Sequence, residues 1–321
     1  MKDGTGVLIL LTNDDGIYAP GLAALDRQLR RLGEVCVVAP ATEQSGVGHS
    51  ITYLTPLIVK EVYNGDQRWA WTVEGSPADC VRLAIAELCP CRPELVVSGI
   101  NSGLNAGINV LYSGTVAAAI EGAFFGITSV AVSLEFDEHA QYDKAAGLAR
   151  QVIQQILTRK RPEPQLYNLN IPTAALSGTP EVRIVPMDVA RYGERFERRI
   201  DPWGRAYYWA TGQPPPPVVE HETDLSAIAR GFVTLTPLDY NMTREPVLAE
   251  MQRWRFALDR PEAEGEGRVD AAVCRPVVMT ERKKRKPVAP ERCELHRGIG
   301  NSGTGNSGTG SGTGGEPCDE S

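Results

Sequence analysis

Short apolar segments alternate with amphipathic segments along the first 170 residues of the chain. Residues 7–11, 35–39 and 95–98 are apolar nearly throughout, which is typical of parallel strands buried on both faces. Residues 129–134 and 166–171 are predicted as further strands. Because strands separated by helices favour parallel β-α-β units, the pattern predicts an α/β fold.

Helices are predicted between these strands from apolar spacing and capping residues. Leucines recur at helical spacing over residues 22–32, and Gly33 ends this helix. Ser76 followed by Pro77 is typical of a helix start. Two more helices are expected at 115–125 and 142–157. Residues 51–73 are expected to form strands around a turn at 64–66.

The pattern changes after residue 180. Residues 184–199 and 205–211 flank the turn 201–204 and predict a long β-hairpin rich in Arg, Tyr and Trp. Such a hairpin could pack on another subunit or fold back on its own domain, and the sequence leaves both open. A short helix at 224–229, a strand at 232–236 and a last helix at 247–258 follow.

From about residue 261 the chain becomes low in complexity. Residues 262–266 are acidic and spaced by glycine, 282–286 are basic, and 301–315 repeat Asn, Ser, Gly and Thr. Because such sequence cannot bury apolar surface, residues 261–321 are expected to be a disordered tail. Residues 1–260 are expected to form the functional domain, with a projecting hairpin arm at about 185–215.

Composition narrows the class of protein. The 321 residues are 42% hydrophobic, enough for a sizeable core, and carry a net charge of −7. This charge argues against binding of nucleic acid polymers or anionic membranes. No apolar run reaches the ~18 residues that span a bilayer, and the N-terminus lacks a signal-peptide pattern. Seven cysteines, an odd number, argue against a complete disulfide framework, so we expect a reduced, cytoplasmic protein.

Polar loops follow three of the predicted strands and meet the expectations for a metal site. The first contains Asp14 and Asp15, the second Ser45, and the third Asn101 and Asn105. Because ligands bind at the carboxyl ends of parallel strands, these loops are expected on one edge of the sheet. Carboxylate, hydroxyl and amide oxygens suit Mg²⁺, Mn²⁺ or Ca²⁺.

A fourth loop, Ser113-Gly114-Thr115, runs directly into a helix. Free backbone N–H groups and the helix dipole make such a start a site for phosphate. A metal beside phosphate suggests metal-assisted phosphoryl transfer to water. Plainer interpretations remain open at this point, because Asp-Gly also marks ordinary turns and Ser113 also suits a helix cap.

Five motifs occur in order along the chain and together resemble those of the survival protein SurE family of metal-dependent nucleotidases. They are Thr12-Asn13-Asp14-Asp15-Gly16, Ala39-Pro40 with Gln44-Ser45-Gly46, Gly75-Ser76-Pro77-Ala78-Asp79-Cys80, Ser98-Gly99-Ile100-Asn101-Ser102-Gly103, and Tyr112-Ser113-Gly114-Thr115-Val116. Residues 168–172, Thr223-Asp224 and 234–238 are similar to later family signatures, so the resemblance covers about residues 6–258.

The resemblance implies hydrolysis of nucleoside 5′- and 3′-monophosphates, and of short polyphosphate in some members. It implies one divalent cation per subunit, Mg²⁺ or Mn²⁺, and a Rossmann-like domain whose C-terminal hairpin arm and helix build homodimers or homotetramers. The metal ligands that it implies are Asp14, Asp15, Ser45 and Asn101. The phosphate ligands that it implies are Asn105, Ser113, Gly114 and Thr115.

The chain departs from the family pattern at one position, since Asn109 stands where many members carry an acid before the Tyr-Ser-Gly-Thr motif. Asp14, Asp15 and Asn105 are the residues expected to act in catalysis, either by activating water or with Asp14 as the nucleophile. One alternative is a regulatory protein that binds nucleotide and metal without turnover. A nicotinamide-dependent enzyme is a third hypothesis, but no Gly-x-Gly-x-x-Gly follows the first strand.

Overall fold

The computed structural model describes residues 7–190, 194–212 and 221–257. Its main element is a nine-stranded sheet in the order β3-β4-β2-β1-β5-β6-β7-β11-β8. The strands are β1 Val7–Thr12, β2 Gly33–Pro40, β3 Val59–Asn64, β4 Gln67–Val73, β5 Leu95–Ser102, β6 Thr128–Leu134, β7 Leu166–Ile171, β8 Val182–Ile184 and β11 Val233–Leu238. The six strands from β4 to β7 are parallel, whereas β3 and β11 pair antiparallel with β4 and β7.

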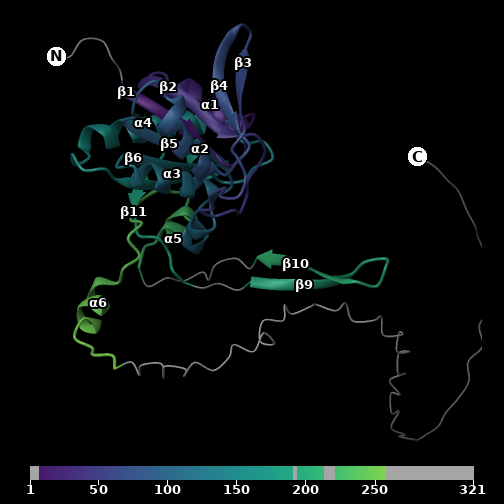
Figure 1. Cartoon of the computed structure of the whole chain (residues 1–321), viewed down its shortest axis with the longest axis vertical. Helices are drawn as coiled ribbons and strands as arrows, with labels where there is room; N and C mark the ends of the chain where they lie inside the picture. The colour runs from purple at the N-terminus through teal and green to yellow at the C-terminus, as the bar shows by residue number, and fades with distance from the viewer. Residues whose placement is uncertain (1–6, 191–193, 213–220, 258–321) are drawn as a thin grey trace, which may run out of the picture. The chain divides into compact units, whose positions relative to one another are not determined.

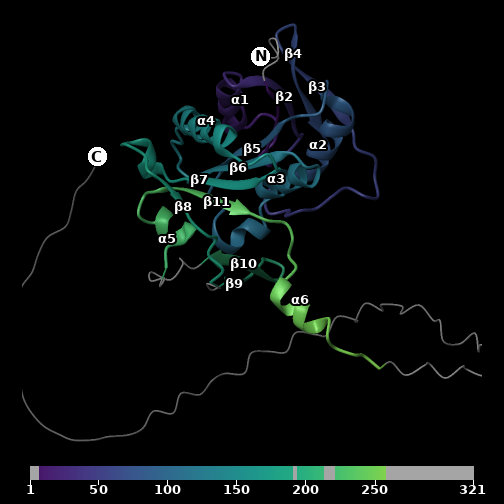
Figure 2. The same cartoon turned by 90° about the vertical axis from the view of Figure 1, so that its left-hand side faces the viewer.

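Helices cover both faces of the sheet, as Figures 1 and 2 show. On one face lie α1 (Pro20–Leu29) and α4 (Tyr142–Arg159), and on the other α2 (Pro77–Leu83) and α3 (Gly114–Phe124). Side chains alternate accordingly along β1, where Ile9 and Leu11 join the core under α1 and Leu10 joins the core under α2. The expected Rossmann-like α/β architecture is therefore confirmed.

Short helical segments connect these layers. Ala84–Leu88 is a π-helical turn that continues α2, and Gly107–Leu111 and Thr173–Leu176 are 3₁₀ turns. The second half of the chain adds α5 (Asp224–Ile228) and α6 (Glu245–Met251). None of the described helices is long and apolar enough to cross a membrane.

The expected hairpin forms a separate two-stranded sheet of β9 (Glu194–Ile200) and β10 (Ala206–Gly212). The predicted turn at 201–204 is confirmed, because the Asp201 carboxylate accepts the backbone N–H groups of Trp203 and Arg205, each at 2.9 Å. The first strand begins at 194 and not at 184. Residues 182–184 instead form β8 in the main sheet, and Pro186, which lacks an N–H group, follows it.

Other boundaries also differ from the expectation. The first helix ends at Leu29, and Gly33, which was expected to end it, is the first residue of β2. Residues 51–58 form no strand, since Tyr53 and Leu54 are exposed and the Thr52 N–H donates to the Asp79 carboxylate of α2. The last helix spans 245–251 and not 247–258. None of its residues is buried, so no packing surface supports a longer helix. The expected disordered tail at 261–321 lies outside the described residues.

Candidate active site

The two acids lie directly beyond the carboxyl end of β1. Asp14 is only 4% exposed, and Asp15 is partly buried beside it. The turn that carries them is held by the Asn13 side-chain amide, which donates to the Gly16 carbonyl at 2.9 Å. Gly16 has a φ of +96° and packs against the backbone of Thr42 and Glu43, so a residue with a side chain would be strained there.

Burial makes the negative charge of this pair costly. It raises the pKa of Asp14, although the Thr115 hydroxyl hydrogen bond opposes the shift. Burial and then the Asp14 charge raise the pKa of Asp15 to about 6. Within residues 7–190, 194–212 and 221–257, no ion pair neutralises either carboxylate. Two carboxylates in this state are suited to share a cation.

The N-terminus of α3 packs directly against Asp14. The Thr115 hydroxyl donates to Asp14 Oδ1 at 2.5 Å, and Ser113 caps the helix by accepting the N–H of Val116 at 3.1 Å. A Cβ atom on Gly114 would lie 2.9 Å from Asp14 Cβ and 3.0 Å from Asp14 Oδ2. Only glycine therefore allows this approach, which puts the acidic pair and the predicted phosphate loop in one site.

The loop after β2 brings Ser45 to the same edge. The Gln44 N–H donates to the Asp14 carbonyl at 2.7 Å, and the Gly48 N–H donates to the Tyr112 carbonyl at 3.0 Å. Ser45 is exposed, and its hydroxyl donates to Glu43 at 2.6 Å. The lone pairs of that hydroxyl oxygen are still available to a cation.

The end of β5 and the loop after it supply the two predicted asparagines: Asn101 is the second-to-last residue of β5 and not a loop residue as expected, and Asn105 follows in the loop. The Ser102 N–H donates to Asp15 Oδ2 at 3.2 Å, which places Asn101 directly beside the acidic pair. The Asn101 amide nitrogen donates to the Gly103 carbonyl at 2.7 Å. Asn105 is buried, and its amide nitrogen donates to Ser133 at 2.8 Å and lies 3.5 Å from the Thr115 hydroxyl. The predicted site residues thus come from the end of β5, the start of α3 and the loops after β1, β2 and β5, and these segments contact one another.

The donor chemistry fits one hard divalent cation. No group of three or more His, Cys, Asp or Glu side chains that could hold a metal occurs in the described part of the chain. A cation here would therefore rest on two carboxylates and on neutral oxygens, a set that suits Mg²⁺ or Mn²⁺ better than Zn²⁺.

Comparison with known proteins identifies the family. Residues 9–198 match the family profile described as survival protein SurE. The chain belongs to the SurE family. A protein of Rhodopirellula baltica named 5'-nucleotidase SurE is 61% identical over 249 residues, which cover 77% of this chain and 98% of that protein.

Further SurE proteins support the assignment. A 5'-nucleotidase SurE of Desulforudis audaxviator is 41% identical over 251 residues, 77% of this chain and 96% of its own. The crystal structure of the SurE protein from Aquifex aeolicus superposes with a TM-score of 0.68 at 36% identity and covers 76% of this chain and 98% of that one.

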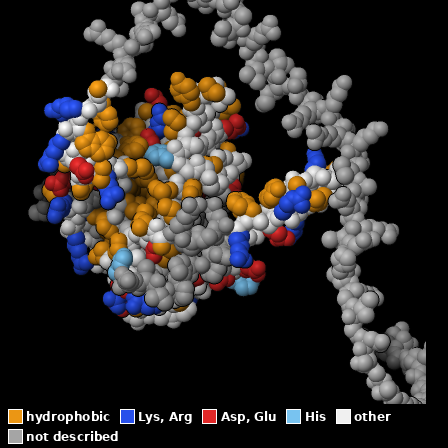
Figure 3. Space-filling model, turned by 90° about the horizontal axis from the view of Figure 1, so that it is seen from below, with side chains coloured by type: hydrophobic (Ala, Val, Ile, Leu, Met, Phe, Trp, Pro, Cys, Tyr) orange, Lys and Arg blue, Asp and Glu red, His pale blue; other side chains and the backbone are white. Residues whose placement is uncertain are grey.

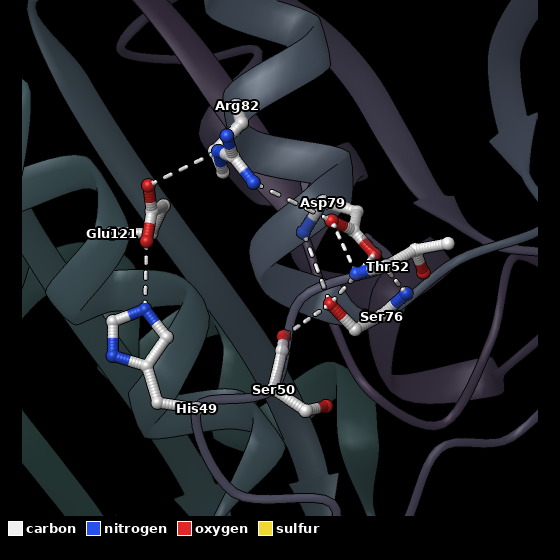
Figure 4. A network of polar contacts seen from close by, with 7 residues as sticks. All are labelled: His49, Ser50, Thr52, Ser76, Asp79, Arg82 and Glu121. Carbon is white, nitrogen blue, oxygen red and sulfur yellow. Dashed lines mark hydrogen bonds and ion pairs between the residues drawn. The ribbon is translucent and has the colours of Figure 1, made fainter. Parts of the chain in front are cut away.

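A partly buried polar network connects the Ser45 loop of this SurE chain to α2 and α3 (Figure 4). The Asp79 carboxylate caps α2 together with Ser76 and accepts the Thr52 N–H at 2.9 Å. Figure 4 also shows Glu121 of α3 between Arg82 and His49, and the His49 ring nitrogen lies 2.7 Å from its carboxylate. The loop is thereby tied at two points beyond Ser45.

Sequence reasoning missed Glu43. Its charge raises the pKa of both Asp14 and Asp15, and its carboxylate accepts the Ser45 hydroxyl. The only signal was its position beside Ser45 in a loop that follows a buried strand. Asn109, the position at which the chain departs from the expected family pattern, is exposed at the 3₁₀ turn before Tyr112.

Proposed function

We propose that this SurE chain is a hydrolase, a divalent-metal-dependent phosphomonoesterase that cleaves nucleoside 5′-monophosphates to nucleoside and phosphate. Nucleoside 3′-monophosphates and short polyphosphate are proposed as further substrates. The observation that carries the proposal is the contact between Gly114 and Asp14, because it joins a cation-binding carboxylate pair to a helix start that binds anions. The names of the relatives support the nucleotide as substrate.

Each predicted residue has a role in this proposal. Asp14, Asp15, Ser45 and Asn101 hold one Mg²⁺ or Mn²⁺ per subunit, which supplies Lewis-acid polarisation of the phosphoryl group. The N–H groups at Ser113 and Gly114 and the Thr115 hydroxyl bind the phosphate oxygens. Asn105 donates to the developing negative charge, since the Thr115 oxygen at 3.5 Å occupies its second N–H only weakly.

The first test is metal-dependent turnover. The protein is stripped with a chelator and then assayed on a generic phosphomonoester and a panel of nucleotides with Mn²⁺, Mg²⁺ or Ca²⁺ restored. We expect phosphate release to return with Mn²⁺ or Mg²⁺. A protein that binds the metal and the nucleotide but releases no phosphate would favour the regulatory alternative instead.

The Asp14→Asn variant tests the acidic pair. We expect turnover to fall by about 10²-fold or more, because cation binding and charge stabilisation are both lost. Folding should be kept, since the site already disfavours a charge at this position. Asp66→Asn, in the exposed turn between β3 and β4, is the control and should hydrolyse at the wild-type rate. Near-normal hydrolysis by Asp14→Asn would refute the metal assignment.

We further propose that the chain forms a homodimer or homotetramer through the β9–β10 hairpin. By the strand register, Phe196, Tyr208 and Ile200 share one face, and they are 63%, 60% and 54% exposed. Several large apolar side chains exposed together on one face are typical of a protein–protein interface. The hydrophobic side chains that Figure 3 shows from below lie mostly on the body of the molecule, so the exposed side chains of the hairpin are the ones that support this proposal.

A further inference from the structure

Strand β7 carries two asparagines that no role above uses. In the segment Asn168-Leu169-Asn170-Ile171, Leu169 and Ile171 join the core under α1 and α4. Asn168 and Asn170 alternate with them and so face α3, yet both are fully buried. Buried amides are costly unless hydrogen-bonded, so their partners indicate what they do.

Both asparagines hold the backbone of Asn105. The Asn105 N–H donates to Asn170 Oδ1 at 2.9 Å, and the Asn170 amide nitrogen donates back to the Asn105 carbonyl at 3.0 Å. The Asn168 amide nitrogen donates to the same carbonyl at 2.7 Å. One side chain thus binds both the N–H and the C=O of Asn105, as a neighbouring strand would.

The adjacent strand fixes the Asn105 side chain. Ser133 lies opposite Asn170 in the β6–β7 register, and its hydroxyl accepts from the Asn105 amide at 2.8 Å. The backbone and the side chain of Asn105 are therefore both fixed by one row of residues across the sheet. That row lies on the face covered by α3, which carries Thr115.

Helix α5 holds the following turn of the same loop. The Asp224 carboxylate accepts the Gly107 N–H at 2.8 Å and, through its other oxygen, the Asp188 N–H at 2.9 Å. Asp224 is fully buried, and Thr223 before it donates to Asp188 at 3.0 Å. Residues of β7 and α5 thus hold the loop 105–107 by hydrogen bonds, although both segments follow it by more than 60 residues.

We propose that Asn170 is a positioning residue that fixes the Asn105 backbone, so that the Asn105 amide points at the phosphate bound by the start of α3. Asn168 and Asp224 assist it at the neighbouring backbone atoms. The inference rests on the proposed function and adds a role for β7 and α5 in phosphate binding. Pre-set donors stabilise a transition state only when they are held in place, and a displacement of about 1 Å can cost roughly 10²-fold in rate.

The test replaces Asn170 without changing its size. Asn170→Asp keeps the acceptor for the Asn105 N–H but turns the donor into an oxygen that repels the Asn105 carbonyl. We expect kcat to fall about 10- to 100-fold, while Mn²⁺ affinity stays within about twofold. Lowering the pH should raise the ratio of variant to wild-type activity, because the introduced carboxyl regains a donor when protonated.

A second variant and a control keep the result interpretable. Asn170→Ser removes the paired hydrogen bonds without adding a charge, should the aspartate prevent folding. Thr234→Val is the matched control, since Thr234 lies opposite Asn170 on β11, is fully buried and has no hydrogen-bond partner for its hydroxyl in the described residues. It should leave kcat unchanged.

Hydrogen exchange at the Asn105 amide separates this inference from the proposed function. We expect faster exchange in both Asn170 variants and wild-type exchange in Thr234→Val, whether or not the protein turns over nucleotides. If the wild-type protein releases no phosphate, the proposed function fails and the exchange still tests the positioning role. If both Asn170 variants keep kcat within twofold and protect the amide normally, the positioning role is refuted and the proposed function stands.

Discussion

At the scale of single residues, the candidate site depends on the close contact between Gly114 and Asp14, which leaves no room for a side chain at position 114. Asp14 is buried, bears a raised pKa and still touches the first turn of α3 through the space that Gly114 leaves. The motif showed that a glycine stands there, but the sequence did not show that its missing side chain faces Asp14. That distance arises from how α3 packs on the sheet, which no local pattern encodes.

Gly114→Ala tests this contact. Alanine favours helix, so the helix itself should not suffer, but the new methyl group would press on Asp14 and displace the carboxylate or the helix end. We expect metal-dependent turnover to fall at least about tenfold, measured with saturating Mn²⁺. Gly147→Ala in α4, where a Cβ meets no atom within 4 Å, is the control. Equal activity in both variants would contradict the contact.

At the scale of elements, the strands of the core were predictable and the irregular segments were not. Residues 166–171 match β7 at both ends, and the α3 prediction begins one residue late, because apolar runs and caps act locally. Residues 51–58 are held by Asp79 of α2, a contact with a partner 27 residues away that periodicity cannot reveal. In the same way, β11 lies between β7 and β8 in the sheet although it follows both in the sequence, and local patterns do not reveal this placement.

Asp79→Ala tests how strongly α2 holds that irregular segment. The change removes a helix cap and leaves the Thr52 and Ser76 N–H groups without their acceptor. We expect a loss of about 1–3 kcal/mol in the free energy of unfolding, measured with denaturant, and faster proteolysis within residues 44–54. Asp143→Ala, which breaks an ion pair between exposed side chains, should cost no more than about 0.5 kcal/mol. A stable, protease-resistant Asp79→Ala protein would show that other contacts suffice.

At the scale of the whole molecule, the hairpin is the element that bears on whether the chain assembles with other copies. Its residue types and turn were evident in the sequence, but the choice between packing on a subunit and folding back was left open. In the described residues, β9 and β10 hydrogen-bond only to each other and expose aromatic side chains. This exposure supports packing of the hairpin on another subunit.

The double variant Phe196→Ser with Tyr208→Ser tests that assembly. Both side chains lie on one face of the hairpin and make no core contact, so folding should be unaffected. We expect the mass measured by light scattering to fall toward that of a single chain, 34.8 kDa. Glu197→Gln, on the opposite face, should keep the mass of the wild-type assembly. An unchanged mass in the double variant would exclude this face as the contact.

The hydrogen bond between Asp224 of α5 and Gly107 also has a consequence during translation. Asp14 and Asp15 leave the ribosome about 210 residues before Asp224, an interval of roughly 10–40 s at ordinary elongation rates. A nascent chain therefore carries its acidic pair long before the residues that complete the proposed phosphate pocket are synthesised. Catalytic competence should appear abruptly and late, as a product of finished synthesis, and stalled fragments that end before α5 should be inert.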